Sequence, residues 1–373
     1  MGPTGDALRV LQLHVSRRCN LACSHCYSGS GPEHADELPV ALWHGVIDDA
    51  ARAGYNVVGF SGGEPLMFAP LRALLQQARG LGMLTTVTTN GMLLDARRIT
   101  ALTGAAGLVA ISLDGTPQSH NRMRGHPRAF ATLLRRLPAL RASGLPFGFI
   151  FTLTQFNLDE LIWAAEFAVA QGARLLQVHP LEAVGRASET LSDAVPDETE
   201  LAYAVLAVAR LKELVGEQLV IQLDVAGRDA MQAAPERVFA AHEDLPADRP
   251  LGEWLSPLIV EPDGTVVPVE YAFGRAWSLG NLRDAPLPVL AERWTRERRA
   301  GFQALCRRVQ HEATAPEQPA VINWYGRLAQ ASGGSGAVAH GVPAPQRHRV
   351  SAPARSQDDV GQHGLDLRAQ RAA

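Results

Sequence analysis

The hydrophobic positions along the first 225 residues alternate between two kinds of pattern. Short, almost continuously apolar runs predict strands that are buried on both faces. Longer segments with apolar residues every three or four positions predict helices that cover those strands. The predicted strands are 9–15, 56–60, 83–89, 107–114, 147–153 and 174–180, and the predicted helices are 39–54, 71–82, 128–144 and 157–172. Strand then helix, repeated, predicts an α/β fold with a parallel sheet, either open or curled into a barrel.

The pattern changes in the second half of the chain. The predicted segments are an acidic linker at 188–200, a helix at 200–215, a strand at 218–225, a β-hairpin at 258–271 and two helices at 287–310. The hairpin prediction depends on the Asp-Gly pair within "LIVEPDGTVVPVEY", which favours a tight turn between strands. From Ser332 onward the chain is rich in Gly, Ser and Pro without periodicity, which predicts a disordered tail over 332–373.

Composition and charge exclude some classes of partner. Hydrophobic residues make up 46% of the chain and charged residues 20%, as in ordinary globular proteins. The formal net charge of −3 argues against a nucleic-acid partner, which would require a basic excess. The absence of an apolar run of 18 residues or of a secretory signal indicates no membrane span and a cytoplasmic location.

Three of the four cysteines lie in one short segment, "RCNLACSHCY". Cys19, Cys23 and Cys26 follow the first predicted strand, so their thiolates can converge on one metal centre. A structural zinc ion requires a fourth ligand, but His25 is poorly placed beside Cys26, and Cys306 is remote in the chain. An iron–sulfur cluster held by three cysteines leaves one iron open, which is the mark of a reactive centre. The sequence alone leaves both a zinc ion and an iron–sulfur cluster as candidates.

The segment resembles the C-x3-C-x-aromatic-C signature of radical S-adenosylmethionine (SAM) enzymes, with His25 in the aromatic position. Four further motifs stand in the family's order: "SGGEP" (61–65), "TTNG" (88–91), "SLDG" (112–115) and "HNRMRG" (120–125). The resemblance covers roughly residues 8–225 and extends more weakly to about 310. It implies a partial (β/α)6 TIM-like barrel that holds one [4Fe–4S] cluster on Cys19, Cys23 and Cys26 and binds SAM.

The resemblance also assigns SAM contacts. The implied positions are His25, Gly62, Gly63, Glu64, Asn90, Ser112, Arg124 and Val178. The two glycines would let the backbone approach the methionyl amine, and Glu64 would accept from it. Ser112 and Arg124 would anchor the carboxylate and ribose. The His25 region would lie against adenine, whose apolar face would pack on Val178, and Asn90 would line the same mouth.

The hairpin at 258–271 is similar to that of the SPASM and Twitch domains, which bind further clusters. Val269 stands at the usual cysteine position, and Val309 stands where a partner for Cys306 is expected. The resemblance therefore implies a barrel over 1–225 followed by a Twitch-like cap over 226–315 without auxiliary clusters. Cys306 is then predicted to be a buried, inert thiol.

The same comparison suggests residues that contact substrate. Glu270 stands where the sulfatase-maturating relatives carry an acidic proposed base, so it is a candidate catalytic residue; a solvated hairpin glutamate is the alternative. His179, Glu182 and Arg186 follow the sixth strand and are candidates for substrate contact.

The resemblance implies reductive cleavage of SAM to a 5′-deoxyadenosyl radical, with an electron from flavodoxin or ferredoxin. The substrate favoured by the SPASM branch is a ribosomal peptide that is crosslinked, epimerised or similarly modified. Because no leader-binding domain precedes the first strand, a separate recognition protein is expected. The alternatives are a small metabolite, such as an amino-sugar or tetrapyrrole intermediate, and a non-catalytic zinc-binding interaction protein.

Overall fold

The computed structural model describes residues 7–35, 37–233 and 249–333. The chain divides into two units, Met1–Ala337 and Val338–Ala373. All described residues belong to the first unit. Of the tail predicted at 332–373, only Ser332 and Gly333 are described, where they end the last helix; the remainder lies outside the described residues.

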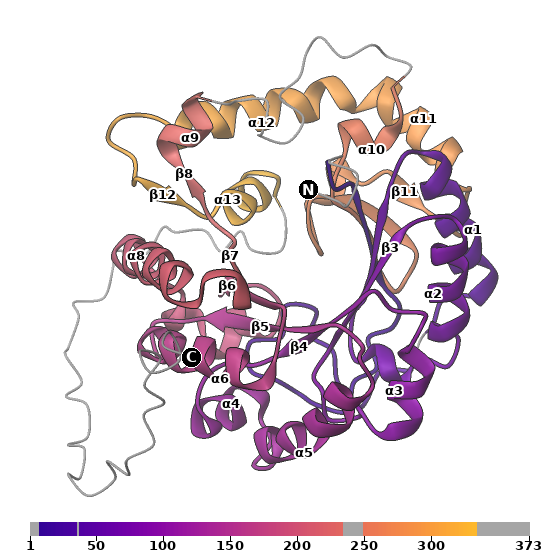
Figure 1. Ribbon diagram of the computed structural model, residues 1–373. Coiled ribbons are helices and arrows are strands. Elements are labelled where there is room, and N and C mark those ends of the chain that lie inside the picture. The colour runs from indigo at the N-terminus through magenta and orange to yellow at the C-terminus, as the bar shows by residue number, and fades with distance from the viewer. Residues whose placement is uncertain (1–6, 36, 234–248, 334–373) are drawn as a thin grey trace, which may run out of the picture. The chain divides into compact units, whose positions relative to one another are not determined.

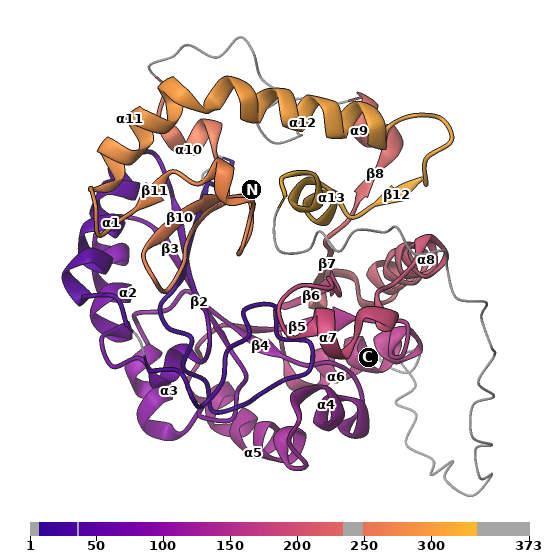
Figure 2. The same ribbon diagram turned by 180° about the vertical axis from the view of Figure 1, so that it is seen from behind.

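A ten-stranded sheet forms the centre of the described part of the chain, in the order β11-β10-β9-β1-β2-β3-β4-β5-β6-β7. The parallel strands are β1 (Val10–His14), β2 (Val57–Ser61), β3 (Leu84–Thr89), β4 (Leu108–Ser112), β5 (Phe147–Leu153), β6 (Leu175–Pro180) and β7 (Val220–Leu223). Figures 1 and 2 show that this sheet curves, with helices along its outer face. The predicted partial barrel is confirmed, and all of the predicted strands are present.

Helices connect the parallel strands on the outside. They are α1 (Val40–Arg52), α2 (Leu71–Gly80), α3 (Ala96–Leu102), α4 (Pro117–Arg124), α5 (Ala129–Ala142), α6 (Leu161–Gln171) and α8 (Glu198–Val215), with short 3-10 turns η1 (Pro65–Met67), η2 (Leu158–Glu160) and η4 (Gly216–Gln218). The sequence analysis missed α3 and α4. With 7 and 8 residues, they are too short to display a helical hydrophobic period.

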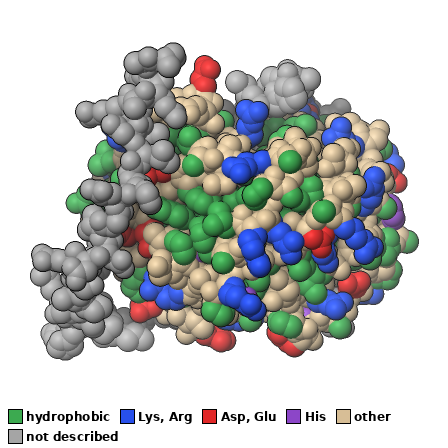
Figure 3. Space-filling model, turned by 60° about the horizontal axis from the view of Figure 1, so that its bottom comes forward, with side chains coloured by type: hydrophobic (Ala, Val, Ile, Leu, Met, Phe, Trp, Pro, Cys, Tyr) green, Lys and Arg blue, Asp and Glu red, His purple; other side chains and the backbone are tan. Residues whose placement is uncertain are grey.

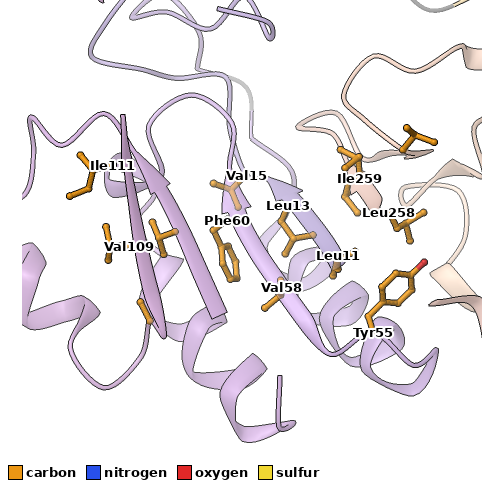
Figure 4. Close-up of a cluster of buried hydrophobic side chains, with 14 of the residues drawn as sticks. Leu11, Leu13, Val15, Tyr55, Val58, Phe60, Val109, Ile111, Leu258 and Ile259 are labelled. Carbon is orange, nitrogen blue, oxygen red and sulfur yellow. The ribbon is translucent and has the colours of Figure 1, made fainter. Parts of the chain in front are cut away.

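The core explains why the strands read as continuously apolar. Leu11 and Leu13 of β1 lie beside Val58 and Phe60 of β2 in parallel register, and all four are fully buried. Figure 4 shows these side chains together with Leu258 and Ile259 from β9. Helices cover the outer face of the sheet, so side chains on that face of the strands are buried against them.

The C-terminal part of the chain extends the same sheet. β9 (Leu258–Val260) pairs in parallel with β1 and forms the predicted hairpin with β10 (Thr265–Pro268), which pairs with β11 (Gly280–Asn281). The remaining elements are β8 (Ala226–Gly227), α9 (Arg228–Ala233), α10 (Leu251–Trp254), η6 (Arg275–Trp277), α11 (Leu287–Glu297), α12 (Arg299–Ala313), β12 (Val321–Ile322) and α13 (Trp324–Ala331). The boundary predicted between 225 and 226 stays a prediction, because the sheet is continuous across the two parts.

The predicted linker at 188–200 is wrong. The segment contains α7 (Ala187–Thr190) and η3 (Ser192–Ala194) and leads directly into α8. Ala187 and Ala194 are fully buried with Leu181 in a small apolar cluster of their own. Three of the acidic residues, Glu189, Asp193 and Glu198, are exposed, whereas Asp197 and Glu200 form the capping box of α8, so an acidic composition imitated a linker.

The surface carries charge of both signs. Figure 3 shows basic side chains interspersed with hydrophobic and neutral ones over one face. Across the described ranges, every helix is too short or too polar to traverse a lipid bilayer.

Candidate active site

The three clustered cysteines occupy one loop that follows β1. Cys19 and Cys23 are buried, with 7% and 8% of their surface exposed, whereas Cys26 is half-buried. All three are free thiols. The loop is held by backbone hydrogen bonds at both sides: Cys19 N donates to Gly31 O at 3.1 Å, and Ser24 N donates to Met123 O at 3.0 Å. The thiols are therefore fixed near the carboxyl end of β1, the edge where parallel βα folds place their chemistry.

Each thiol has one polar neighbour, and the neighbours come from different segments. Asn90 Nδ2 lies 3.9 Å from Cys19 Sγ, and Arg124 Nη1 lies 3.8 Å from Cys23 Sγ. Ser28 Oγ lies 3.5 Å from Cys26 Sγ. Burial raises the pKa of the Cys19 thiol to about 12, so a metal must displace the proton for the thiolate to form. Three thiols, two with an N–H group and one with a hydroxyl near the sulfur atom, suit an iron–sulfur cluster, whose potential depends on such contacts.

The glycines of "SGGEP" pack against the cysteine loop. A Cβ on Gly63 would lie 2.2 Å from Arg18 O, and one on Gly62 would lie 2.6 Å from Ser16 O. Gly63 N also donates to Ser16 O at 2.7 Å. Only glycine allows this approach. The predicted contact of these glycines with the SAM amine stays a prediction, but their observed contact explains the motif by itself.

Glu64 is a buried carboxylate that joins two strand ends. Its Oε1 accepts hydrogen bonds from Leu66 N at 3.0 Å and Thr89 Oγ1 at 2.8 Å, and its Oε2 accepts from Asn90 N at 2.9 Å. Burial raises its pKa, and the three donors oppose that effect. The side chain fixes the turn after β3, and hence Asn90, beside Cys19. The contact with SAM predicted for Glu64 stays untested.

Arg124 is the last residue of α4 and forms a buried ion pair that the sequence analysis did not predict. Its Nε and Nη2 donate to the two carboxylate oxygens of Asp114 at 2.7 and 3.0 Å, which leaves Nη1 facing Cys23. Asp114 is fully buried; burial raises its pKa, but the Arg124 guanidinium outweighs burial and holds the pKa at about 2. The fork predicted to grip the SAM carboxylate is thus already used, and only one edge of Arg124 is left for a ligand.

His120 also contacts Asp114. Its Nδ1 accepts a hydrogen bond from Asp114 N at 3.2 Å, and its side chain is 1% exposed. Burial lowers the pKa of His120 to about 4, so the ring is neutral at physiological pH. The charge of Asp114 is therefore balanced by Arg124 alone within this group.

The other predicted SAM positions divide into two groups. His25 lies within the cysteine loop, and Ser112 is the last residue of β4, at the carboxyl edge of the sheet. His25 Nδ1 is buried and has no hydrogen-bond partner among the described atoms, so a bound ligand could supply one.

Val178 lies in the core and not in the cysteine loop. It is 0% exposed in the main core and alternates with Gln177 and His179, which both reach Asp224. Its side chain is therefore buried in the core, and the predicted contact with adenine stays a prediction.

Arg186, which was predicted with His179 and Glu182 as a candidate for substrate contact, contacts the cysteine loop. Its Nη1 donates to Cys23 O at 2.8 Å and its Nη2 to Ser30 O at 2.9 Å. Its backbone N donates to Cys26 O at 2.9 Å. The segment after β6 therefore closes over the cysteine loop, and Arg186 supports that loop instead of facing substrate.

His179 and Glu182 lie in a charged group at the carboxyl ends of β6 and β7, with residues of the C-terminal part. His179 Nδ1 is 3.2 Å from Asp224 Oδ2, and Asn323 Nδ2 donates to Glu182 Oε1 at 2.9 Å. Burial alone would lower the pKa of His179, but Asp224, Glu182 and Glu270 raise it to about 9. Burial and the neighbouring Glu182 raise the pKa of Glu270 well above its usual range. We call these residues, His179, Glu182, Asp224 and Glu270, the mouth group.

Glu270 is presented by a strained turn after β10. Val269 and Ala272 on either side have φ values of 71° and 61°, a region that side chains rarely adopt. Ala272 N donates to Glu261 Oε1 at 2.8 Å, and the Tyr271 ring stacks on His14 of β1 at 4.9 Å. The solvated-hairpin alternative for Glu270 is therefore not what the structure shows, since the residue is half-buried beside His179 and Glu182. Sequence reasoning found Glu270 but missed Tyr271, Asp114 and Asp224.

Cys306 lies away from the other cysteines in α12 and is 0% exposed. Burial raises its pKa to about 12. The prediction of a buried thiol is confirmed. Among the described residues, no three His, Cys, Asp or Glu side chains are placed to hold a single metal ion.

The described residues thus form an α/β protein with a parallel barrel, and a loop of three thiols follows its first strand at the edge where such folds carry their chemistry. The family model of the radical SAM superfamily matches residues 13–168. The Fe-coproporphyrin III synthase of Methanosarcina barkeri is 30% identical over 304 residues, which cover 78% of this chain and 74% of that protein. The PqqA peptide cyclase of Ruegeria pomeroyi is 31% identical over 265 residues, covering 69% and 66%. The chain therefore belongs to the radical SAM superfamily and is an enzyme of that type; membership implies a [4Fe–4S] cluster and SAM.

Solved structures support the fold. Streptococcus suis SuiB bound to S-adenosylmethionine superposes with a TM-score of 0.63 at 18% identity, covering 80% of this chain and 68% of SuiB. The anSMEcpe protein with bound AdoMet gives a TM-score of 0.59 at 15% identity, covering 87% and 96%. At such identities the likeness concerns the fold alone, and it spans both the barrel strands and the C-terminal elements.

Proposed function

We propose that this enzyme holds one [4Fe–4S] cluster on Cys19, Cys23 and Cys26, binds SAM at its open iron, and removes a hydrogen atom from a peptide substrate. When bound, the two groups together supply a 5′-deoxyadenosyl radical at the cost of one electron, for which a flavodoxin- or ferredoxin-type donor is proposed. The observation that carries this proposal is the loop of three free thiols, two of them with N–H donors near their sulfur atoms.

The chain's own residues fix that loop and keep it dry. Gly62 and Gly63 allow their backbone to pack closely against the cysteine loop, and Arg186 donates hydrogen bonds to two backbone carbonyl groups of that loop. Asn90 and Arg124 each present an N–H to a sulfur atom. Such packing buries Cys19 and Cys23, which limits the access of water and external reductants to this part of the loop and favours survival of a reactive intermediate.

The mouth group supports a peptide over a tetrapyrrole. Three carboxylates, Glu182, Asp224 and Glu270, surround the single imidazole of His179. Porphyrin intermediates carry carboxylate side chains, which the carboxylates of Glu182 and Asp224 disfavour, whereas a peptide amine or guanidinium can pair with them. Glu270, whose raised pKa favours its neutral form, adds a hydrogen-bonding group and no fixed charge. SuiB has been solved bound to its precursor peptide SuiA. The resemblance to Fe-coproporphyrin III synthase keeps a tetrapyrrole as the second candidate.

The radical chemistry is tested by anaerobic reconstitution with iron and sulfide, followed by SAM and dithionite. We expect about four irons per chain and formation of 5′-deoxyadenosine. Cys23→Ala should abolish both cluster assembly and SAM cleavage, whereas Cys306→Ala should leave the iron content and the cleavage rate at wild-type values. A wild-type chain that bound only a single zinc ion would refute the proposal, and a halved iron count in Cys306→Ala would refute the single cluster.

The substrate class is tested separately with deuterated compounds. A lysine- or arginine-containing precursor peptide should transfer deuterium to 5′-deoxyadenosine, and an iron-loaded coproporphyrin should not. The reverse result would assign the tetrapyrrole. A separate leader-recognition protein and a cytoplasmic location are further parts of the proposal. Adding the recognition protein encoded with the peptide should lower the KM for that peptide.

A further inference from the structure

The Asp114–Arg124 ion pair beside Cys23 is buried. Asp114 is 0% exposed, and the Arg124 side chain is 10% exposed. A surface ion pair adds little, but a buried pair costs desolvation and is retained where its position matters. The pair touches only one of the three thiols, through Arg124 Nη1 at 3.8 Å from Cys23 Sγ.

The bidentate contact leaves the guanidinium no freedom to turn. Nε and Nη2 are both taken by Asp114, so Nη1 is the corner that points at the sulfur. Asp114 is fixed in turn by its backbone: its N–H donates to His120 Nδ1 at 3.2 Å, and its carbonyl accepts from Asn157 Nδ2 at 3.1 Å. Hydrogen bonds thus fix both the side chain and the backbone of Asp114, which indicates that its position matters and not only the space it fills.

Reduction of a [4Fe–4S] cluster adds one negative charge close to Cys23. A guanidinium beside the sulfur favours the added charge, and a carboxylate behind the guanidinium opposes it. Because both groups are buried, solvent ions screen these terms poorly. The two residues thus have opposite effects on the same one-electron step.

We propose that the Asp114–Arg124 pair sets the reduction potential of the cluster, with Arg124 holding an N–H and a positive charge at the Cys23 sulfur and Asp114 positioning and partly neutralising it. The inference rests on the proposed function for the presence of the cluster. The proposal concerns the effect of two protein charges on the cluster, so its test is the midpoint reduction potential of the cluster and not the turnover rate.

The experiment measures the cluster's midpoint potential by EPR-monitored titration of reconstituted protein without SAM. We expect Asp114→Asn to raise the potential and Arg124→Gln to lower it, each by about tenfold in the one-electron equilibrium, or about 59 mV. The double variant should fall between the two. Arg124→Lys keeps the charge but cannot grip Asp114 with two donors, so its potential should stay above that of Arg124→Gln.

The control is the ion pair of α1, where Arg52 Nη2 lies 2.5 Å from Asp49 Oδ1 on the outer surface. Arg52→Gln should leave the potential unchanged. Single variants that hold full iron but shift in the same direction, or do not shift, would overturn the proposal. Loss of the cluster in Asp114→Asn would also overturn it by assigning the pair to assembly. Failure of the proposed function is distinct, because it means no cluster in the wild-type chain.

Discussion

The side chains that surround the cysteines act on them at short range and from several segments. Asn90, Arg124 and Arg186 come from the end of β3, the end of α4 and the loop after β6, and each contacts a cysteine sulfur or carbonyl. Every one of them is held by a further partner. The loop is therefore supported by the ends of several strands, which is why a single loop can fix three thiols.

Glu270→Gln separates the two stages of the reaction. Glu270 lies in the mouth group, away from the cysteines, so SAM cleavage should continue while peptide modification slows at least tenfold. Because burial and Glu182 disfavour the charged form of Glu270, replacing the ionisable carboxyl by a neutral amide should also raise Tm at pH 7.5. Assays of 5′-deoxyadenosine, modified peptide and thermal unfolding check this. Unchanged peptide turnover would remove Glu270 from the catalytic group.

The His179–Asp224 contact makes stability depend on pH. The folded-state pKa of His179, about 9, lies above its ordinary 6.5. The stabilisation is therefore complete below about pH 6.5 and is lost as pH rises toward 9. Urea unfolding at intervals from pH 6 to 9.5 should show this loss, and His179→Gln should remove it. The control His311→Gln, on an exposed position of α12, should retain the wild-type profile; the same loss in both variants would contradict the assignment.

Sequence reasoning located the thiols and Glu270 because motif spacing carries them. It missed Asp114 as the partner of Arg124, since "SLDG" also fits an ordinary turn, and it missed Asp224, which no motif marks. It placed Val178 at the adenine by family position alone; the structure shows its side chain buried in the core, and the contact stays a prediction. Contacts between residues distant in sequence could not be read from local patterns.

At the scale of elements, the long ones were predictable and the short ones were not. The buried strands and the helices α1, α2, α5 and α6 follow from periodicity, because each is long enough to show its repeat. α3 and α4 are too short, and the acidic run at 188–200 imitated a linker. The hairpin β9–β10 was found through its Asp-Gly turn, but its parallel pairing with β1 was not foreseeable, because pairing partners are set by the whole fold.

The strained turn after β10 gives a prediction of its own. Ala272 has a φ of 61°, where glycine is preferred, so Ala272→Gly should stabilise the protein by up to about 1 kcal/mol, or about 2 °C in Tm. Ala139→Gly, on the exposed side of α5, should instead destabilise it by about 1 kcal/mol, since glycine weakens a helix interior. Thermal unfolding measures both. Shifts of the same sign would show that the turn is not strained.

At the scale of the molecule, β9 makes the barrel and the C-terminal elements one hydrogen-bonded sheet. Tyr55 Oη also donates to Leu255 O at 2.5 Å, and Val10 N donates to Ser256 Oγ at 2.9 Å. Contacts of this kind across the proposed domain boundary favour a single cooperative unit over two independent domains.

Unfolding should therefore be one transition. Two tryptophans lie in the barrel helices and four in the C-terminal part: Trp43 and Trp163, and Trp254, Trp277, Trp294 and Trp324. In urea, the midpoint from tryptophan fluorescence should coincide with that from far-UV circular dichroism, which reports chiefly on the barrel. Leu258→Ala in β9 should move both midpoints together, by about 2–5 kcal/mol in unfolding free energy. An earlier fluorescence transition would show that the cap unfolds alone.

The position of β9 orders events during biosynthesis. β1, which leads into the cysteine loop, has β2 on one side and β9 on the other, and β9 begins only at Leu258. While the ribosome is still adding the intervening residues, one edge of β1 lacks its strand partner and the loop lacks the turn that carries Tyr271. Iron delivered to a nascent chain would thus meet an unfinished scaffold, and we expect assembly of the cluster that the family implies to follow synthesis of the hairpin.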